Sequence, residues 1–229
     1  MSDSSHHASS LTPIVLFDLD GTLTDSAPGI HEGFRRALAA VGHPEPTPAM
    51  LDSVVGPPMV DTFRSMGLDE PTIERAIAAY FEYYEDSGWS ENSVFDGISD
   101  LLDRVGRSHG RLAITTSKNE RIAIRILTHF GLDGHFEFIG GASDDGSRRT
   151  KSDVIAHSLS ALGVTPTEGA TPGVILVGDR DHDVHGAARW GIPTVFVEWG
   201  YGSAAESVDA RWTAADAAEL ERIIAEHVR

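Results

Sequence analysis

Cysteine is absent from the 229 residues of the chain. This absence excludes disulfides, thiolate catalysis, and zinc or iron–sulfur sites built on cysteine. It leaves the redox compartment of the protein undetermined, because a chain without cysteine is compatible with any compartment.

Basic residues are scarce. Lysine and arginine number 18 against 35 aspartates and glutamates, which gives a net charge of −17 and an isoelectric point near 4.9. Such a surface repels the phosphates of nucleic acids and of anionic lipids, so we expect neither a nucleic acid nor a membrane as a partner. The same field repels a small anionic substrate unless a cation and local donors reverse it within a site.

Long apolar runs are also missing, and none approaches the ~20 residues that span a bilayer. The polar start (MSDSSHHASS) has no apolar core of the kind found in signal peptides, so residues 1–12 are predicted to be a disordered tail. We therefore expect a cytoplasmic protein. The sequence leaves open whether it is a monomer or a homodimer.

Short apolar runs occur at residues 14–17 (IVLF), 112–116, 174–177 (VILV) and 194–197 (TVFV). Segments with helical spacing of apolar residues separate them. This alternation predicts an α/β fold, a Rossmann-like doubly wound parallel sheet with helices on both faces.

One long stretch interrupts this rhythm. After the first strand, apolar residues keep helical spacing through residues 28–41, 58–66 and 72–86, with no strand between them. We interpret residues 26–92 as an inserted, all-helical cap domain. The α/β core is then built from residues 13–25 and 93–229.

Polar clusters follow the predicted strands. They are DLDGT (18–22), TTSKN (115–119) and GDRDHD (178–183), and Lys151 stands at the start of a predicted helix. In open parallel sheets, ligands bind beyond the carboxyl ends of the strands. We therefore expect these four elements to converge on one cleft.

The aspartates at these strand ends predict a metal site and a nucleophile for phosphorus. Clustered carboxylates without cysteine suit a hard, oxygen-preferring cation, most simply Mg²⁺. Asp18 and Asp20 are two residues apart, so in an extended chain their side chains lean the same way. One can attack phosphorus while the other, held neutral by its like-charged neighbour, protonates the leaving group.

The remaining polar residues suit a transferring phosphoryl group. Gly21 permits a tight turn, and its amide can face a phosphoryl oxygen. Thr116, Ser117 and Lys151 supply hydroxyl, amide and ammonium donors to the charge that must be stabilised.

DLDGTLTD, the strand ending in TTSK, the lone lysine and VGDRDHD resemble, in this order, the four signature motifs of the haloacid dehalogenase (HAD)-like hydrolases. The segments DSAPGI, VVGPPM, HFGLDGHFEFIGG and GIPTVFVEWGYG are similar to the phosphoglycolate-phosphatase-type subgroup, in which a helical cap follows the first motif. The resemblance covers most of the chain.

The resemblance implies a role for each motif residue. Asp18 is the nucleophile and a metal ligand, and Asp20 is the general acid and base, with its backbone carbonyl also reaching the metal. Asp179 completes the metal site, and Asp183 is a ligand or a partner of the ligands. The residues implied to bind phosphate are Gly21, Thr116, Ser117, which stands where many relatives carry asparagine, and Lys151.

These residues predict a Mg²⁺-dependent phosphatase for a small phosphorylated metabolite, phosphoglycolate-like or a nucleoside monophosphate, acting through an aspartyl-phosphate. Two alternatives stay open. One is a mutase-like or kinase-like phosphotransferase with an acceptor other than water, and the other is a non-catalytic regulatory protein. Candidate residues for substrate choice in the cap are His31, Arg35, Arg64 and the turn at 55–59.

Overall fold

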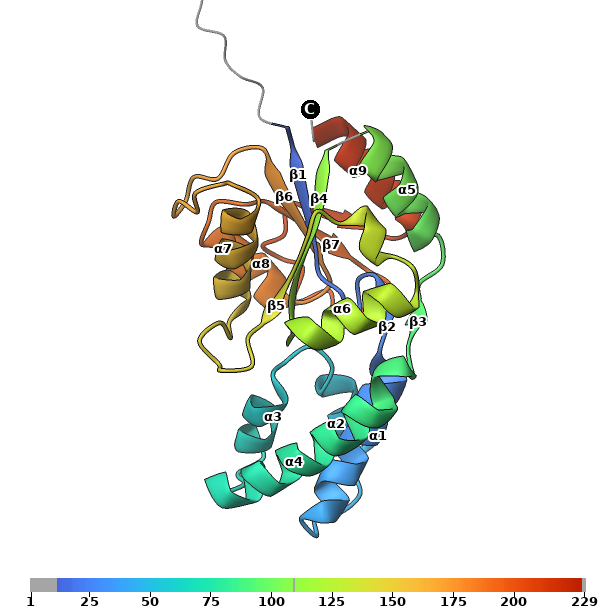
Figure 1. Ribbon diagram of the computed structural model, residues 1–229, viewed down its shortest axis with the longest axis vertical. Helices are drawn as coiled ribbons and strands as arrows, with labels where there is room; N and C mark the ends of the chain where they lie inside the picture. The colour runs from blue at the N-terminus through green and yellow to red at the C-terminus, as the bar shows by residue number, and fades with distance from the viewer. Residues whose placement is uncertain (1–11, 109, 228–229) are drawn as a thin grey trace, which may run out of the picture.

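The computed structural model describes residues 12–108 and 110–227 (Figure 1). The predicted disordered tail, apart from its last residue, lies outside this range. No helix within the described ranges is both long and apolar enough to cross a membrane.

A sheet of six parallel strands forms the centre of the molecule, in the order β5-β4-β1-β6-β7-β8. Its strands are β1 (Ile14–Phe17), β4 (Arg111–Asn119), β5 (Phe138–Ala142), β6 (Val174–Gly178), β7 (Thr194–Val197) and β8 (Trp212–Ala214). In β1, Phe17 is in register with Ile114 on one side and Val177 on the other. The carboxyl ends of β4, β1 and β6 therefore lie next to one another.

Helices cover both faces of the sheet (Figure 1). Val15 and Phe17 of β1 pack into a core that includes α5 (Ile98–Ser108), α6 (Glu120–His129) and α9 (Ala217–His227). The alternate residues Ile14 and Leu16 pack on the other face, toward α7 (Lys151–Ala161) and α8 (Asp181–Ala188). Because all four β1 side chains are buried, the strand is apolar throughout. The predicted doubly wound α/β core is confirmed.

A helical cap lies beyond the carboxyl ends of the strands (Figure 1). It contains α1 (Ala27–Ala40), α2 (Pro48–Ser53), α3 (Met59–Ser65), α4 (Glu70–Asp86) and the 3₁₀ turn η1 (Gly88–Ser90). The short antiparallel strands β2 (Thr24–Asp25) and β3 (Ser93–Val94) pair where the chain enters and leaves the cap. The predicted helical cap is thus present, and its boundaries at residues 26 and 92 stay a prediction.

The interior of the cap is apolar and continuous with the core on one face of the sheet. Phe34 of α1 and Phe63 of α3 are fully buried, with ring centroids 5.5 Å apart and nearly parallel planes. Tyr80 and Tyr84 of α4 are also buried and stacked, at 5.3 Å. The aromatic side chains of this helix therefore serve mainly packing, with the exposed Phe81 as the exception.

Two elements differ from the sequence-based expectation. Residues 43–48 (HPEPTP) contain three prolines and so predict a loop, but Pro48 begins α2, because Thr47 caps it by accepting a hydrogen bond from the Met50 amide at 3.3 Å. Strand β8 is only three residues long and lies at the edge of the sheet. A strand this short has too few residues to show alternation.

Truncating Phe34 tests the packing of the cap. We expect Phe34→Ala to lower the free energy of unfolding by about 3–5 kcal/mol, because it opens a cavity in a fully buried site. Phe81→Ala, in the same cap but 40% exposed, should lower it by about 1 kcal/mol or less. Urea denaturation followed by circular dichroism measures both. Equal losses would contradict the packing described.

Candidate active site

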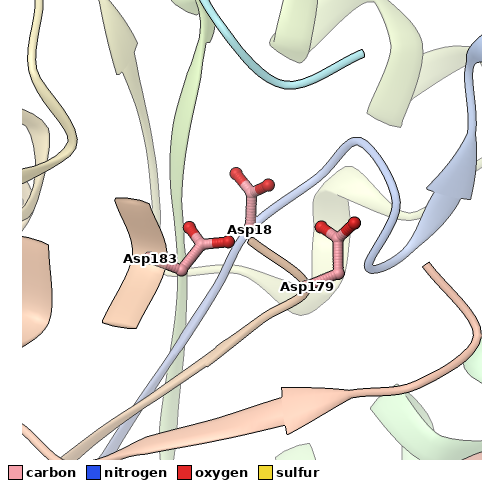
Figure 2. Close-up of side chains that lie close together, drawn as sticks. All are labelled: Asp18, Asp179 and Asp183. Atoms are coloured by element: carbon pink, nitrogen blue, oxygen red, sulfur yellow. The ribbon is translucent and has the colours of Figure 1, made fainter. Parts of the chain in front are cut away.

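Three aspartates meet at the carboxyl ends of β1 and β6 (Figure 2). Asp18 directly follows β1, Asp179 directly follows the neighbouring β6, and Asp183 lies in the first turn of α8. Their carboxylate oxygens lie within 4.8 Å of one another, and all three residues are buried. Parallel pairing of β1 with β6 brings Asp18 and Asp179 together across 161 residues of sequence.

Lys151 is buried among these carboxylates. It is the first residue of α7, and its Nζ lies 2.6 Å from Asp18 Oδ1 and 2.5 Å from Asp183 Oδ1. The cluster therefore contains three carboxylates and one ammonium, a formal charge of −2. Since no net charge of this size is stable in a buried site, the cluster requires protons or a divalent cation.

The pKa values reflect this crowding. Burial, with the charges of Asp183 and Asp18 added, raises the pKa of Asp179 well above its ordinary value. Burial also raises the pKa of Asp18, against the opposing effect of Lys151. For Lys151 itself, burial works against the charged form, but the two carboxylates outweigh it and raise its pKa. The ammonium is thus held charged.

Both oxygens of Asp183 contact donors of the protein. One of its oxygens pairs with Lys151, and the other accepts the Arg180 amide at 3.0 Å. Asp179 is oriented instead by the Tyr201 amide at 2.8 Å and by the Thr22 hydroxyl at 3.3 Å. The three carboxylates lie close enough to share one divalent cation, and Asp183 also positions Lys151 and the start of α8.

Gly21 makes room for Asp179. Its φ is +80°, and a Cβ at this position would overlap the Asp179 carboxylate. Its amide donates to the Thr24 carbonyl at 2.8 Å. The N–H expected to face a phosphoryl oxygen is therefore used within the turn, and the substrate-binding role of Gly21 stays a prediction.

Asp20 faces a cation rather than another carboxylate. Lys118 Nζ lies 3.1 Å from Asp20 Oδ2 and donates to the Tyr84 hydroxyl of the cap at 2.7 Å. The close partner of Asp20 is thus an ammonium, and the expected neutral state of Asp20 stays a prediction. Its assignment as general acid and base stays a prediction.

The second polar cluster lies beside these residues. Thr116 is buried at the end of β4, and its hydroxyl accepts the Lys118 amide at 3.2 Å. Ser117 lines a cavity of about 500 Å³ between the cap and the core, and Asp20 lines the same cavity. Their predicted contacts with phosphate are untested.

The turn at 55–59 contributes residues to this cavity, as expected for a segment that chooses the substrate. Arg35 and Arg64 do not line it, since Arg35 pairs with Glu45 and Arg64 with Glu70 on the surface of the cap. His31 also lies outside the lining.

Several site residues carried no firm assignment from sequence. Lys118 stands in TTSK, and Tyr84 is one of the packed aromatic residues of α4. Tyr201 lies in the segment after β7. Its hydroxyl also donates to Asp25 at 2.7 Å, so it links the hinge of the cap to Asp179. No local pattern of sequence marks such a contact.

The model of the family described as haloacid dehalogenase-like hydrolase matches residues 15–197. The chain belongs to this family. The resemblance inferred from the motifs is therefore confirmed, and the cluster at β1, β6 and α7 lies where the HAD motifs were expected to converge.

Proteins similar to this chain are named for different activities. The tyrosine-protein kinase PtkA of Mycobacterium tuberculosis is 53% identical over 83% of this chain, and the chain spans 64% of the length of that protein. A 5′-nucleotidase of Pseudomonas aeruginosa is 40% identical over 94% of this chain and 96% of its own length. A crystal structure of a predicted phosphatase from Clostridium acetobutylicum superposes with a TM-score of 0.87, with 36% identity, and covers 95% of this chain and 100% of that one.

Removing the buried ammonium tests the charge balance of this HAD site. Without divalent cations, we expect Lys151→Met to lower the free energy of unfolding by about 3–5 kcal/mol, because it leaves three buried carboxylates without their counter-ion. Excess Mg²⁺ should restore part of the loss. Urea denaturation with chelator or with Mg²⁺ measures both effects.

The matched control is Arg149→Met, which removes a cation from an exposed pair with Asp61. Its effect should be small and independent of Mg²⁺. A Lys151 variant as stable as the unmodified protein in chelator would contradict the charge balance.

Proposed function

We propose that the protein is a Mg²⁺-dependent phosphatase that hydrolyses a small phosphomonoester through an aspartyl-phosphate on Asp18. One observation carries this proposal. Asp18 lies in a buried cluster of formal charge −2 at the carboxyl end of the sheet, and Asp20, two residues on, lines a cavity under the cap.

A divalent cation is the partner that this cluster fits. Asp18 and Asp179 would hold it, together with the backbone carbonyl of Asp20 that the family resemblance implies. When bound, Mg²⁺ supplies positive charge to the phosphoryl oxygens and lowers their repulsion of an attacking carboxylate.

In the first step, a carboxylate oxygen of Asp18 attacks phosphorus and the bond from phosphorus to the leaving oxygen breaks. Lys151 already donates to Asp18 and fixes its direction, at 2.6 Å. Asp20, protonated at this stage, gives its proton to the departing oxygen. Thr116 and Ser117 lie at the end of β4, where their donors would steady the transferring group.

In the second step, Asp20 takes a proton from water, and that water attacks the phosphorus of the aspartyl-phosphate. The bond between Asp18 and phosphorus then breaks, which releases inorganic phosphate and regenerates the carboxylate. In the described conformation Asp20 is paired with Lys118. Substrate would have to displace this ammonium before Asp20 could serve the leaving group.

The cap would exclude bulk water during the first step. Its contacts to the core support this role, because Arg149 pairs with Asp61 of α3 at 2.7 Å and Arg121 with Glu85 of α4 at 2.7 Å. The 5′-nucleotidase among the relatives supports phosphomonoester hydrolysis as the reaction.

Transfer to an acceptor other than water is the second candidate. A relative with 53% identity is named a tyrosine-protein kinase, so the same aspartate chemistry could serve a hydroxyl acceptor. Turnover in ¹⁸O-labelled water separates the two. A hydrolase places the label in the released phosphate, whereas transfer yields an unlabelled phosphorylated acceptor.

Loss of the nucleophile tests the proposal directly. We expect Asp18→Asn to lower the turnover of an aryl phosphate with Mg²⁺ by at least about a thousandfold, because an amide cannot form the acyl-phosphate. Chelation of the unmodified protein should have a comparable effect. Steady-state release of phosphate measures both.

The control is Asp52→Asn, which changes an exposed aspartate of α2 outside the cavity lining and should retain full activity. Equal rates for the Asp18 variant, the chelated protein and the unmodified protein would contradict an enzymatic role. They would favour a non-catalytic regulatory protein instead.

A further inference from the structure

We propose that the leaving group of the substrate carries a planar aromatic ring, which binds against Phe81 on the apolar face of α4. This inference rests on the proposed phosphatase function and specifies the class of phosphomonoester. It follows from the lining, the charge and the size of the cavity between the cap and the core.

The cavity extends from the reacting centre into the cap. Asp20 and Ser117 line it on the core side, and the turn from Gly56 to Met59 lines it on the cap side. A phosphoryl group at Asp18 would therefore point its leaving group toward α3 and α4. The side chains of these helices are the ones that a leaving group would touch.

The cap wall of the cavity is apolar and rich in aromatic rings. The wall consists of aliphatic and aromatic side chains, those of Ile30, Val54, Met59, Val60, Ile77, Tyr80, Phe81 and Tyr84. Such a wall stabilises apolar and flat groups by burial and by ring stacking.

Phe81 is exposed where its neighbours are not. It is one of three large apolar side chains with high exposure among the described residues, at 40%, whereas Tyr80 and Tyr84 are nearly fully buried. Its ring contacts Tyr80 edge-on, with centroids 5.4 Å apart and planes at 83°, which holds it in place. An exposed and supported aromatic ring in a cavity wall is available for stacking with a ligand.

The charges of the lining argue against an anionic leaving group such as glycolate. Three cations line the cavity, and each is paired: Lys118 with Asp20 at 3.1 Å, Arg121 with Glu85 at 2.7 Å, and Arg149 with Asp61 at 2.7 Å. Three carboxylates, those of Asp20, Glu85 and Asp144, line the same space. The lining therefore carries no net positive charge for a second anionic group.

The size of the cavity also favours a larger leaving group. Its volume of about 500 Å³ lies within the range of sites that bind whole metabolites. A two-carbon glycolate would leave the Phe81 end of the wall without contact. A nucleobase attached through ribose, or the phenol ring of a tyrosine side chain, offers the flat apolar surface that this wall fits.

Two pairs of substrates, each with one ring-bearing member, test the inference. Adenosine 5′-monophosphate is compared with ribose 5-phosphate, and phosphotyrosine with phosphoserine, with 2-phosphoglycolate as the small anionic case. Phosphotyrosine and phosphoserine also differ in the leaving oxygen, which is phenolic in one and aliphatic in the other, so a preference within that pair counts only if it depends on Phe81. We expect at least one ring-bearing member to exceed its ringless partner by about tenfold or more in kcat/KM. The pair that shows the preference identifies a nucleobase or a phenol as the ring.

Equal kcat/KM within both pairs, or a preference for 2-phosphoglycolate, would overturn the inference and leave the phosphatase function intact. Absence of turnover on every compound, including a generic aryl phosphate, would instead overturn the proposed function. The two failures are therefore distinguishable.

Variants of Phe81 locate the ring contact. Phe81→Ala should lower the ratio of kcat/KM between the preferred substrate and its ringless partner about tenfold, mainly through KM. Phe81→Leu, which keeps apolar volume but not the ring, should lose most of the preference, and Phe81→Trp should keep it. The matched control is Ile124→Ala, with similar exposure at 42% but outside this cavity, and its ratio should not change. A Phe81→Ala ratio equal to that of the control would contradict the assignment.

Discussion

The structure depends on the burial of like charge at the end of the sheet. Asp18, Asp179 and Asp183 converge within a few ångströms, and Lys151 neutralises only one of their three charges. A buried cluster with a net charge of −2 destabilises the fold. Such strongly perturbed groups are typical of catalytic sites. In the proposed function, the remaining charge attracts a divalent ion, and through it a phosphate.

The rest of the fold maintains this cluster. Parallel pairing of β1 with β6 fixes the separation of Asp18 and Asp179, and the helix that begins at Lys151 presents the ammonium from the other side. Glycines keep the space open, since a Cβ at Gly21 or Gly202 would overlap Asp179. In the proposed function, the cap adds an apolar wall that contacts the leaving group of the substrate.

Local pattern was enough to predict the central strands of the sheet and the polar residues at their ends. The apolar run before Asp18 and the VILV run before Asp179 mark buried strands, and the topology of parallel sheets places their ends together. Local sequence patterns do not predict the contacts between the cap and the core. The pairing of Lys118 with Asp20 and Tyr84, and the exposure of Phe81 beside buried tyrosines, depend on how α4 lies over β4. The position of α4 over β4 is set by tertiary packing, which leaves no periodic pattern in the sequence.

Anomalous diffraction from crystals grown with Mn²⁺, in place of Mg²⁺, tests the central claim most directly. The account predicts one strong peak within about 2.2 Å of a carboxylate oxygen of both Asp18 and Asp179, with Asp183 still bound to Lys151. A fully occupied peak elsewhere, or no peak at millimolar Mn²⁺, would contradict it.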